Sequence, residues 1–226
     1  MTTSRLYARF VLPVLIDLAM RNKSVRAERA RLLPLARGVV LEVGAGSGLN
    51  MPYYGASVER LYALDPSTEL LRKAVGRGAR SSFPIVPLCH PAEHIPLPDA
   101  SIDSAVMTWT LCSIGDPLTA LREIRRVLAP GGQLIFVEHG RAVDPVVIRW
   151  QDRLTPIWRR FAGGCHLNRP IDRMLADGGF AAPDLERGYV SGPRIGAYFY
   201  RGVARPRPDL TQRGELASLH GGRNEP

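Results

Sequence analysis

Three glycines on alternate positions, Gly44, Gly46 and Gly48, follow a short apolar run over residues 39–43. The run is typical of a buried parallel strand, and the glycines predict a tight turn where a ligand contacts bare backbone. Glu42 stands two residues before the first of these glycines. A carboxylate there attracts a cationic ligand group and repels a pyrophosphate, so the loop predicts a site for a positively charged nucleoside.

A second acid, Asp65, follows Gly44 by 21 residues and comes directly after another apolar run, residues 61–64. An acid at this spacing suits the two ribose hydroxyls of a nucleoside cofactor. Asp65 could equally cap the next helix, because Pro66 and the residues after it resemble a helix start. Taken alone, a strand followed by a glycine turn also allows a purely structural turn, or a nicotinamide or flavin site.

Four motifs in this order resemble those of class I S-adenosylmethionine-dependent methyltransferases, across about residues 38–140. They are the glycine loop with Glu42, then Asp65, the segment 91–103, and the run 128–132, which resembles the family's turn before its fifth strand. The resemblance implies S-adenosyl-L-methionine as the cofactor. It also implies a set of cofactor-binding residues: Glu42, Gly44, Ala45, Gly46, Gly48, Asn50, Asp65, Pro66, Ala92, Glu93 and Thr108.

One position departs from that family's pattern. After the third strand the family often has an acid that faces the adenine amino group, whereas this chain has His90, Pro91 and Ala92. We therefore assign the adenine contact to the backbone of Ala92 or to the side chain of Glu93.

A narrower resemblance covers about residues 38–203. The run 111–117, the pair Glu138 and His139, Trp158, and the run 164–167 resemble the microsomal alkyl-thiol S-methyltransferases and their bacterial relatives. This resemblance implies a small lipophilic acceptor, with a thiol as the first choice. Quinone C-methyltransferases and phospholipid N-methyltransferases share the core motifs and are the alternatives.

Methylation of a thiol needs the thiolate, and the free pKa of a thiol is near 8.5. A neutral imidazole within hydrogen-bond reach can take the proton. His139 and His166 are the candidate catalytic residues, on separate loops that the topology can bring together. Either histidine could instead be a structural residue.

The segment after the fourth strand lines the methyl-transfer centre in the family. Here it begins at Trp109 and lacks the Asn/Asp-Pro-Pro-aromatic run typical of enzymes that methylate base amino groups. Trp109 and Leu111 predict an apolar acceptor pocket, although either could belong to the core. A nucleic-acid methyltransferase and a non-catalytic cofactor-binding protein are the remaining alternatives.

The alternation of strands and helices predicts an α/β fold. We expect a Rossmann-like, doubly wound, mostly parallel seven-stranded sheet with an antiparallel last strand and an N-terminal helical cap. The predicted parts are a cap over residues 1–37, a methyltransferase domain over 38–204 and a disordered tail over 205–226. The expected strands lie at about 39–43, 60–65, 84–88, 102–108, 133–138, 180–190 and 195–203.

An apolar run over residues 6–20 predicts a helix near the N-terminus. It is too short to span a bilayer, and Pro13 and Asp17 interrupt it. We expect it to cover the acceptor site as a lid or to pack on the sheet; peripheral membrane contact through residues 5–23 is the alternative.

The net charge is +9, and only Lys23 and Lys73 of the 30 basic residues are lysines. The arginines are spread along the chain, so no nucleic-acid partner is expected. The three cysteines form no CxxC pair, so no metal site is expected, and their reduced state suggests a cytoplasmic protein. The acceptor is predicted to be a small molecule, and the oligomeric state is left open.

Overall fold

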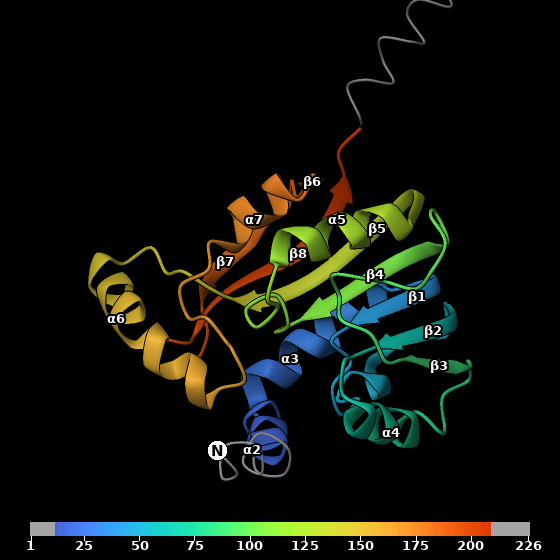
Figure 1. Ribbon diagram of the computed structural model, residues 1–226, viewed down its shortest axis with the longest axis horizontal. Coiled ribbons are helices and arrows are strands. Elements are labelled where there is room, and N and C mark those ends of the chain that lie inside the picture. Colours follow the sequence, from blue (N-terminus) through green and yellow to red (C-terminus); the bar gives the residue numbers. More distant parts are fainter. Residues whose placement is uncertain (1–11, 209–226) are drawn as a thin grey trace, which may run out of the picture.

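The computed structural model describes residues 12–208, and within them the chain forms a twisted sheet of eight strands with helices on both faces (Figure 1). The strand order is β3-β2-β1-β4-β5-β8-β6, and β7 pairs with β8. From β1 the chain adds β2 and β3 toward one edge of the sheet. It then returns to the other side of β1, where β4 and β5 extend the sheet toward the opposite edge. A sheet of this kind binds ligands beyond the carboxyl ends of its strands, where the order reverses.

Five parallel strands form the predicted half of the sheet. They are β1 (Gly38–Val43), β2 (Val58–Leu64), β3 (Ile85–Leu88), β4 (Ile102–Thr108) and β5 (Leu128–His139). Their interiors are rich in buried aliphatic residues because helices cover both faces. The strands begin and end close to the predicted positions, with β5 as the exception.

The run 128–132 was expected to be a turn, but it belongs to β5. Leu128 already pairs with Ile102 of β4, and the register shifts between Ile102 and Ser104. Gly131 has a φ of +79°, which lets the chain bend without leaving the sheet. The prediction was wrong because a bulged strand and a turn share the same glycines.

The antiparallel half also differs from the prediction in detail. β8 (Tyr198–Pro206) runs antiparallel to β5, as expected of the last strand, and extends two residues into the predicted tail. The expected strand over 180–190 is broken into β6 (Phe180–Ala181) and β7 (Glu186–Tyr189). Both pieces pair with β8, so the sheet has eight strands instead of seven.

Two hydrophobic cores lie on opposite faces of the sheet. The helices α5 (Pro117–Val127) and α7 (Ile171–Asp177) pack on one face. The helices α3 (Lys23–Leu32) and α4 (Thr68–Arg77) pack on the other. β1 contributes to both, because Val40 and Leu41 point to opposite faces as neighbours in a strand do.

Two further helices lie at the left and lower sides of Figure 1, away from the flat faces of the sheet. They are α2 (Leu12–Ala19), which is part of the predicted N-terminal helix, and α6 (Pro145–Phe161). Residues 1–11 and 209–226, which include part of the predicted cap and most of the predicted tail, lie outside the described residues. None of the helices in the described part of the chain is long and apolar enough to cross a membrane.

Candidate active site

The glycine loop follows β1 at the carboxyl edge of the sheet. Gly44, Gly46 and Gly48 have φ angles of +72°, +53° and +80°, which side chains other than glycine rarely tolerate. The backbone N–H groups of Gly44 and Ala45 both donate to the carbonyl oxygen of Leu64 at the end of β2. The loop is thereby fixed against the neighbouring strand.

The three glycines serve different purposes. A Cβ atom on Gly44 would lie 2.4 Å from the Thr110 side chain, and one on Gly48 would lie 2.6 Å from Ala74 Cα. These two glycines therefore permit close packing of the loop. A Cβ atom on Gly46 would meet only the carbonyl oxygen of Gly44, at 3.9 Å, so Gly46 faces open space. Gly46 is the position at which a ligand can approach the main chain.

That open space belongs to a cavity of about 540 Å³, which is within the usual size of small-molecule sites. Five of the predicted cofactor residues line it: Gly44, Ala45, Gly46, Asn50 and Thr108. The other six do not: Glu42, Gly48, Asp65, Pro66, Ala92 and Glu93. The first half of α4 and its N-cap form another wall of the cavity, through Ser67, Glu69, Leu70 and Lys73.

Asp65 lies directly behind the loop. Its Oδ2 accepts a hydrogen bond from the backbone N–H of Gly46 at 2.9 Å, and its Oδ1 accepts one from Ser67 at 2.8 Å. Burial raises the pKa of Asp65, although these two backbone hydrogen bonds counteract the rise. The carboxylate therefore both shapes the glycine loop and supports the first turn of α4. Its contact with a ribose stays a prediction.

Glu42 is fully buried and acts through a neighbour. Its Oε1 accepts a hydrogen bond from Asn50 Nδ2 at 2.8 Å, and its Oε2 accepts one from the Tyr54 hydroxyl at 3.0 Å. Burial raises the pKa of Glu42 to about 7, even though both hydrogen bonds favour the charged form. Asn50 stands between Glu42 and the cavity, so Glu42 orients Asn50.

Arg29 was missed in the sequence. It lies on α3, lines the cavity and is only 4% exposed. Its Nε donates to Asn50 Oδ1 at 2.7 Å, its Nη1 donates to the Met20 carbonyl at 2.6 Å, and its guanidinium lies 5.0 Å from the centre of the Trp109 ring. One arginine among many on a helix gave no signal, because its partners are distant in sequence.

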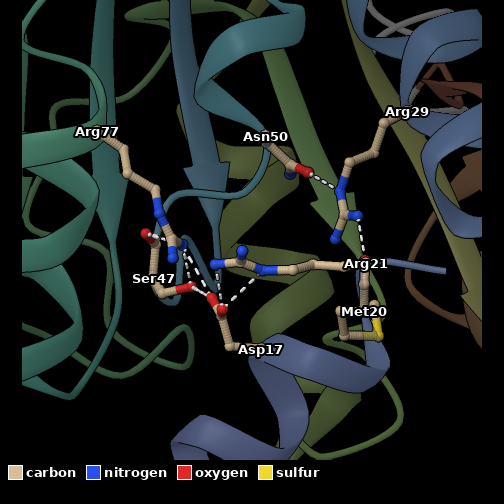
Figure 2. Close-up of polar contacts among 7 residues, drawn as sticks. All are labelled: Asp17, Met20, Arg21, Arg29, Ser47, Asn50 and Arg77. Atoms are coloured by element: carbon tan, nitrogen blue, oxygen red, sulfur yellow. Dashed lines mark hydrogen bonds and ion pairs between the residues drawn. The ribbon is translucent and has the colours of Figure 1, made fainter.

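Residues of α2 and of the turn that follows it form one side of the cavity, and a role as a lid stays a prediction. Ile16, Asp17 and Met20 line the cavity. Figure 2 shows Asp17 between Ser47 of the glycine loop and two arginines. Asp17 Oδ1 accepts hydrogen bonds from the Ser47 hydroxyl and from Arg77 of α4, and Oδ2 pairs with Arg21.

These contacts determine the charge of Asp17. Partial burial alone would raise its pKa, but the hydrogen bonds from Ser47, Arg77 and Arg21 outweigh burial and lower the pKa to about 2. Arg77 also donates to the backbone carbonyl of Ser47 at 2.6 Å. The helix α2, the glycine loop and α4 therefore share one charged cluster.

Trp109 forms the wall beyond β4. It has a φ of +49°, a strained value for an aromatic residue, and its backbone N–H donates to the Val137 carbonyl at 2.8 Å. Its ring packs edge-on against Phe199 with the centroids 5.7 Å apart. The expected apolar pocket therefore contains Trp109, whereas Leu111 is fully buried in the core.

The two predicted loops do come together near the end of β5. The backbone N–H of His166 donates to the Cys112 carbonyl at 2.8 Å, and His139 Nε2 lies 3.0 Å from Cys165 Sγ. The His166 ring nitrogen Nδ1 is 3.1 Å from the same Cys112 carbonyl. Spacing along the chain suggested no thiol cluster, yet the fold places Cys112 and Cys165 beside His139.

The Cys165 thiol is strongly perturbed. Hydrogen bonds from the Cys112 thiol and the His139 imidazole lower the pKa of Cys165 to about 4, although burial opposes this. Burial alone would lower the pKa of His139. The hydrogen bond with Cys165 outweighs burial, so the pKa of His139 is raised. A thiol whose pKa is lowered by a neighbouring imidazole resembles an activated cysteine.

Comparison with known proteins agrees with this geometry. Residues 41–136 match the family described as a methyltransferase domain. Human thiol S-methyltransferase TMT1B is 29% identical over 180 residues, which cover 74% of this chain and 72% of that protein. Human TMT1A, also named a thiol S-methyltransferase, is 31% identical over 157 residues, 68% of this chain and 64% of that protein.

Relatives with other names match as well. Phosphatidylethanolamine N-methyltransferase of Cereibacter sphaeroides is 27% identical over 165 residues, 69% of this chain and 76% of that protein. Demethylmenaquinone methyltransferase of Corynebacterium kroppenstedtii is 31% identical over 121 residues, 54% of this chain and 50% of that protein. Among solved structures, a putative methyltransferase from Bacillus halodurans superimposes with a TM-score of 0.62 at 18% identity, covering 79% of this chain and 96% of that one.

The fold, the glycine loop and the matched domain define the class. The chain belongs to the S-adenosylmethionine-dependent methyltransferases, and S-adenosyl-L-methionine is its cofactor. Its relatives are named as methyltransferases of thiols, of phosphatidylethanolamine and of demethylmenaquinone. Membership of the class therefore does not identify the acceptor of this chain.

Proposed function

We propose that this methyltransferase transfers the methyl group to a small lipophilic thiol. The observation that carries the proposal is the grouping of Cys112, His139 and Cys165 on the same edge of the sheet as the cofactor cavity. The cavity wall is apolar at Trp109, and the loop that starts there carries Cys112. The relatives named thiol S-methyltransferases support the same acceptor.

The cavity suits a sulfonium nucleoside, because it offers open main chain at Gly46 and buried polar groups beside it. We assign the backbone at Gly46 and the acid Asp65 to the nucleoside end, with the predicted contacts of Pro66, Ala92 and Glu93 beyond them. Asn50, held by Glu42, and the guanidinium of Arg29 would bind the amino-acid end. Bound in this way, the cofactor supplies an activated methyl group that needs only a positioned nucleophile in a dry site.

The lid contributes by excluding water. Ile16 and Met20 place apolar atoms over the cavity, and Asp17 fastens α2 to the glycine loop. A closed, apolar site favours transfer to a lipophilic acceptor over hydrolysis or transfer to a polar one. The role of His139 and His166 as proton acceptors stays a prediction, and His139 Nε2 is directed at Cys165.

We further propose that the protein is cytoplasmic and makes a peripheral membrane contact. The outer side of α2 exposes Val14 and Leu18, at 57% and 69%. The helix α6 exposes Trp150 and Ile157 at 51% and 58%, next to several arginines. Apolar side chains flanked by arginines suit an anionic bilayer surface, and a lipophilic acceptor would be concentrated there. Sedimentation with vesicles of anionic and neutral lipid tests this contact.

A direct test uses S-adenosylmethionine with a labelled methyl group and a panel of three acceptors: an alkyl thiol, a reduced quinone and phosphatidylethanolamine. We expect the label on the thiol sulfur, with the highest kcat/KM of the three. Preferential labelling of the quinone or of the lipid would contradict the thiol proposal and identify that compound class as the acceptor. A gel-shift measurement with RNA at moderate salt is expected to show no binding, since the cations are spread over the surface.

A further inference from the structure

Three side chains that commonly bind metal ions meet at the carboxyl edge of the sheet. One ligand atom from each of Cys112, His139 and Cys165 lies within 4.8 Å of the other two. His139 Nε2 is 3.0 Å from Cys165 Sγ. They come from the loop after β4, the end of β5 and the loop after α6, so the tertiary fold alone creates the cluster.

The ligand types favour zinc. Two thiolates and one imidazole are soft and borderline donors that select Zn²⁺ over Mg²⁺ or Ca²⁺. Ligand atoms of a tetrahedral zinc site lie roughly 3.5–4 Å apart, given bond lengths of about 2.0–2.3 Å. The three atoms here lie within 4.8 Å of one another, so small rotations of the side chains would bring them to that spacing. Three protein ligands also leave the fourth position open, which distinguishes catalytic zinc sites from structural ones.

Two buried polar atoms beside the cluster have no hydrogen-bond partner within the described residues. Glu138 precedes His139, is fully buried, and its Oε2 has no hydrogen-bond partner. The Nδ1 of His139 is also buried without a partner. The one guanidinium nearby, that of Arg169, donates to the carbonyl oxygens of Leu111 and Ile114 and does not satisfy these atoms. The unpartnered polar atoms leave hydrogen-bonding capacity for a bound ion and its water beside the cluster.

The loop that carries Cys112 also forms part of the cofactor cavity, although none of the three cluster side chains lines that cavity. Trp109 and Thr110 line the cavity, and Cys112 is two residues further along the same loop. The Cys112 Sγ lies 3.6 Å from the Trp109 carbonyl oxygen. Cys112 is buried at 3% exposure, whereas His139 and Cys165 are only partly buried, so the cluster is accessible from one side.

We propose that Cys112, His139 and Cys165 bind one Zn²⁺ ion whose open fourth position takes the acceptor thiol. This inference rests on the proposed thiol acceptor. On binding, the thiol displaces water and releases its proton to solvent, because zinc lowers the pKa of its ligands. The sulfur then attacks the methyl carbon, a sulfur–carbon bond forms, and the bond from that carbon to the cofactor's sulfonium sulfur breaks. The electron pair stays on the cofactor's sulfur, and the neutral thioether leaves the metal.

Cobalt provides a spectroscopic readout that does not depend on turnover. Reduced, metal-free protein is titrated with Co²⁺, and we expect one equivalent to bind with the visible absorption of a tetrahedral thiolate site. Cys112→Ser, Cys165→Ser and His139→Gln should each weaken Co²⁺ and Zn²⁺ binding at least about tenfold. Cys89→Ser is the matched control, because Cys89 is an exposed thiol outside the cluster, and it should leave binding unchanged.

Alkylation of the wild-type protein removes the concern that a variant misfolds. With zinc present, iodoacetamide should modify Cys89 but not Cys165, and a chelator should restore the reactivity of Cys165. The absence of stoichiometric metal in reduced protein, or equal protection of all three cysteines, would overturn the site.

Adding an alkyl thiol to the cobalt protein tests the open position. We expect a shift in the cobalt absorption with the thiol and none with the matching alcohol. If metal binds and the spectrum does not respond to the thiol, the proposal that the acceptor thiol coordinates the metal is wrong. If no metal binds while the thiol is still methylated, the metal site is wrong and the proposed function stands.

Discussion

Asp17 of α2 accepts a hydrogen bond from Arg77 of α4 at 2.9 Å, across the mouth of the cofactor cavity. The residues are 60 positions apart, and Ser47 of the glycine loop joins the same cluster (Figure 2). The contact links α2 to the glycine loop and to α4, and residues of all three line the cavity. We therefore predict that cofactor entry and release depend on the opening of this cluster.

Replacement of Asp17 by Asn should loosen the lid. The side chain keeps its size but loses the charge that pairs with Arg77, so we expect the dissociation rate of S-adenosylhomocysteine to rise roughly 2- to 10-fold. Stopped-flow displacement measures this rate. Asp99→Asn removes a more exposed ion pair, with Arg126, whose residues do not line the cavity, and should leave the rate unchanged. Equal rates in wild type and Asp17→Asn would contradict the fastening role.

Gly46→Val should abolish cofactor binding. The new side chain would occupy the open space that the nucleoside needs, since a Cβ atom there meets only the Gly44 carbonyl oxygen, at 3.9 Å. Gly131→Val is the control, because Gly131 also has a positive φ and open surroundings but lies outside the cavity. Calorimetry with S-adenosylhomocysteine should detect binding to the control and none to Gly46→Val. Undiminished affinity of Gly46→Val for S-adenosylhomocysteine would show that the glycine loop does not bind the cofactor.

Asp65→Ala should weaken cofactor binding at least tenfold, equivalent to about 1.5–3 kcal/mol of lost hydrogen bonds. Because Asp65 also holds Gly46, a double-mutant cycle separates the two roles. S-adenosylhomocysteine is compared with its 2′-deoxy analogue on both proteins. If Asp65 binds the ribose, wild type should discriminate between the ligands and Asp65→Ala should not. Unchanged discrimination in the variant would leave Asp65 with a purely structural role.

The pH dependence of stability should reveal the buried carboxyl group of Glu42. Its pKa is raised to about 7, so between about pH 4.3 and 7 the folded chain binds a proton that the unfolded chain has released. The contribution of Glu42 to the free energy of unfolding is therefore full below pH 4.3. It decreases as pH rises to 7, by at most about 1.4 kcal/mol per unit. Above that pH it is constant.

Glu42→Gln removes this titration and should flatten the curve relative to wild type over that window. Urea unfolding at several pH values measures both curves. Other buried acids, such as Glu138, contribute to each curve equally, so the difference between the proteins reports Glu42 alone. Parallel curves from pH 4 to 8 would show that Glu42 has an ordinary pKa in the folded protein.

The sequence predicted features that depend on local chemistry. The glycine loop, Asp65 and the parallel strands up to β4 lie where spacing and hydrophobic pattern placed them, because each is encoded within a few residues. The break between β6 and β7 was missed, since strand pairing depends on the distant β8. The alternating glycines did not reveal which of them faces the cavity, because only Gly46 lacks a tertiary neighbour.

Residues that act through tertiary contacts could not be found in the same way. Arg29 reaches Asn50 from another helix, and Cys112 and Cys165 are separated by 53 positions yet meet at His139. Counting cysteines by their spacing along the chain led to the expectation of no metal site, whereas the fold creates a candidate. Spacing rules detect metal sites formed by one or two local segments, and this cluster uses three.

The central claim is that the cavity beside Gly46 holds S-adenosylmethionine with its methyl group facing a thiol. Incubation of the protein with S-adenosylmethionine carrying a deuterated methyl group and an alkyl thiol, followed by mass spectrometry, tests it most directly. We predict a methyl thioether with the full deuterium label and one equivalent of S-adenosylhomocysteine, both absent with Gly46→Val. An unmodified thiol alongside a labelled quinone or lipid, or no affinity for S-adenosylhomocysteine, would contradict the claim.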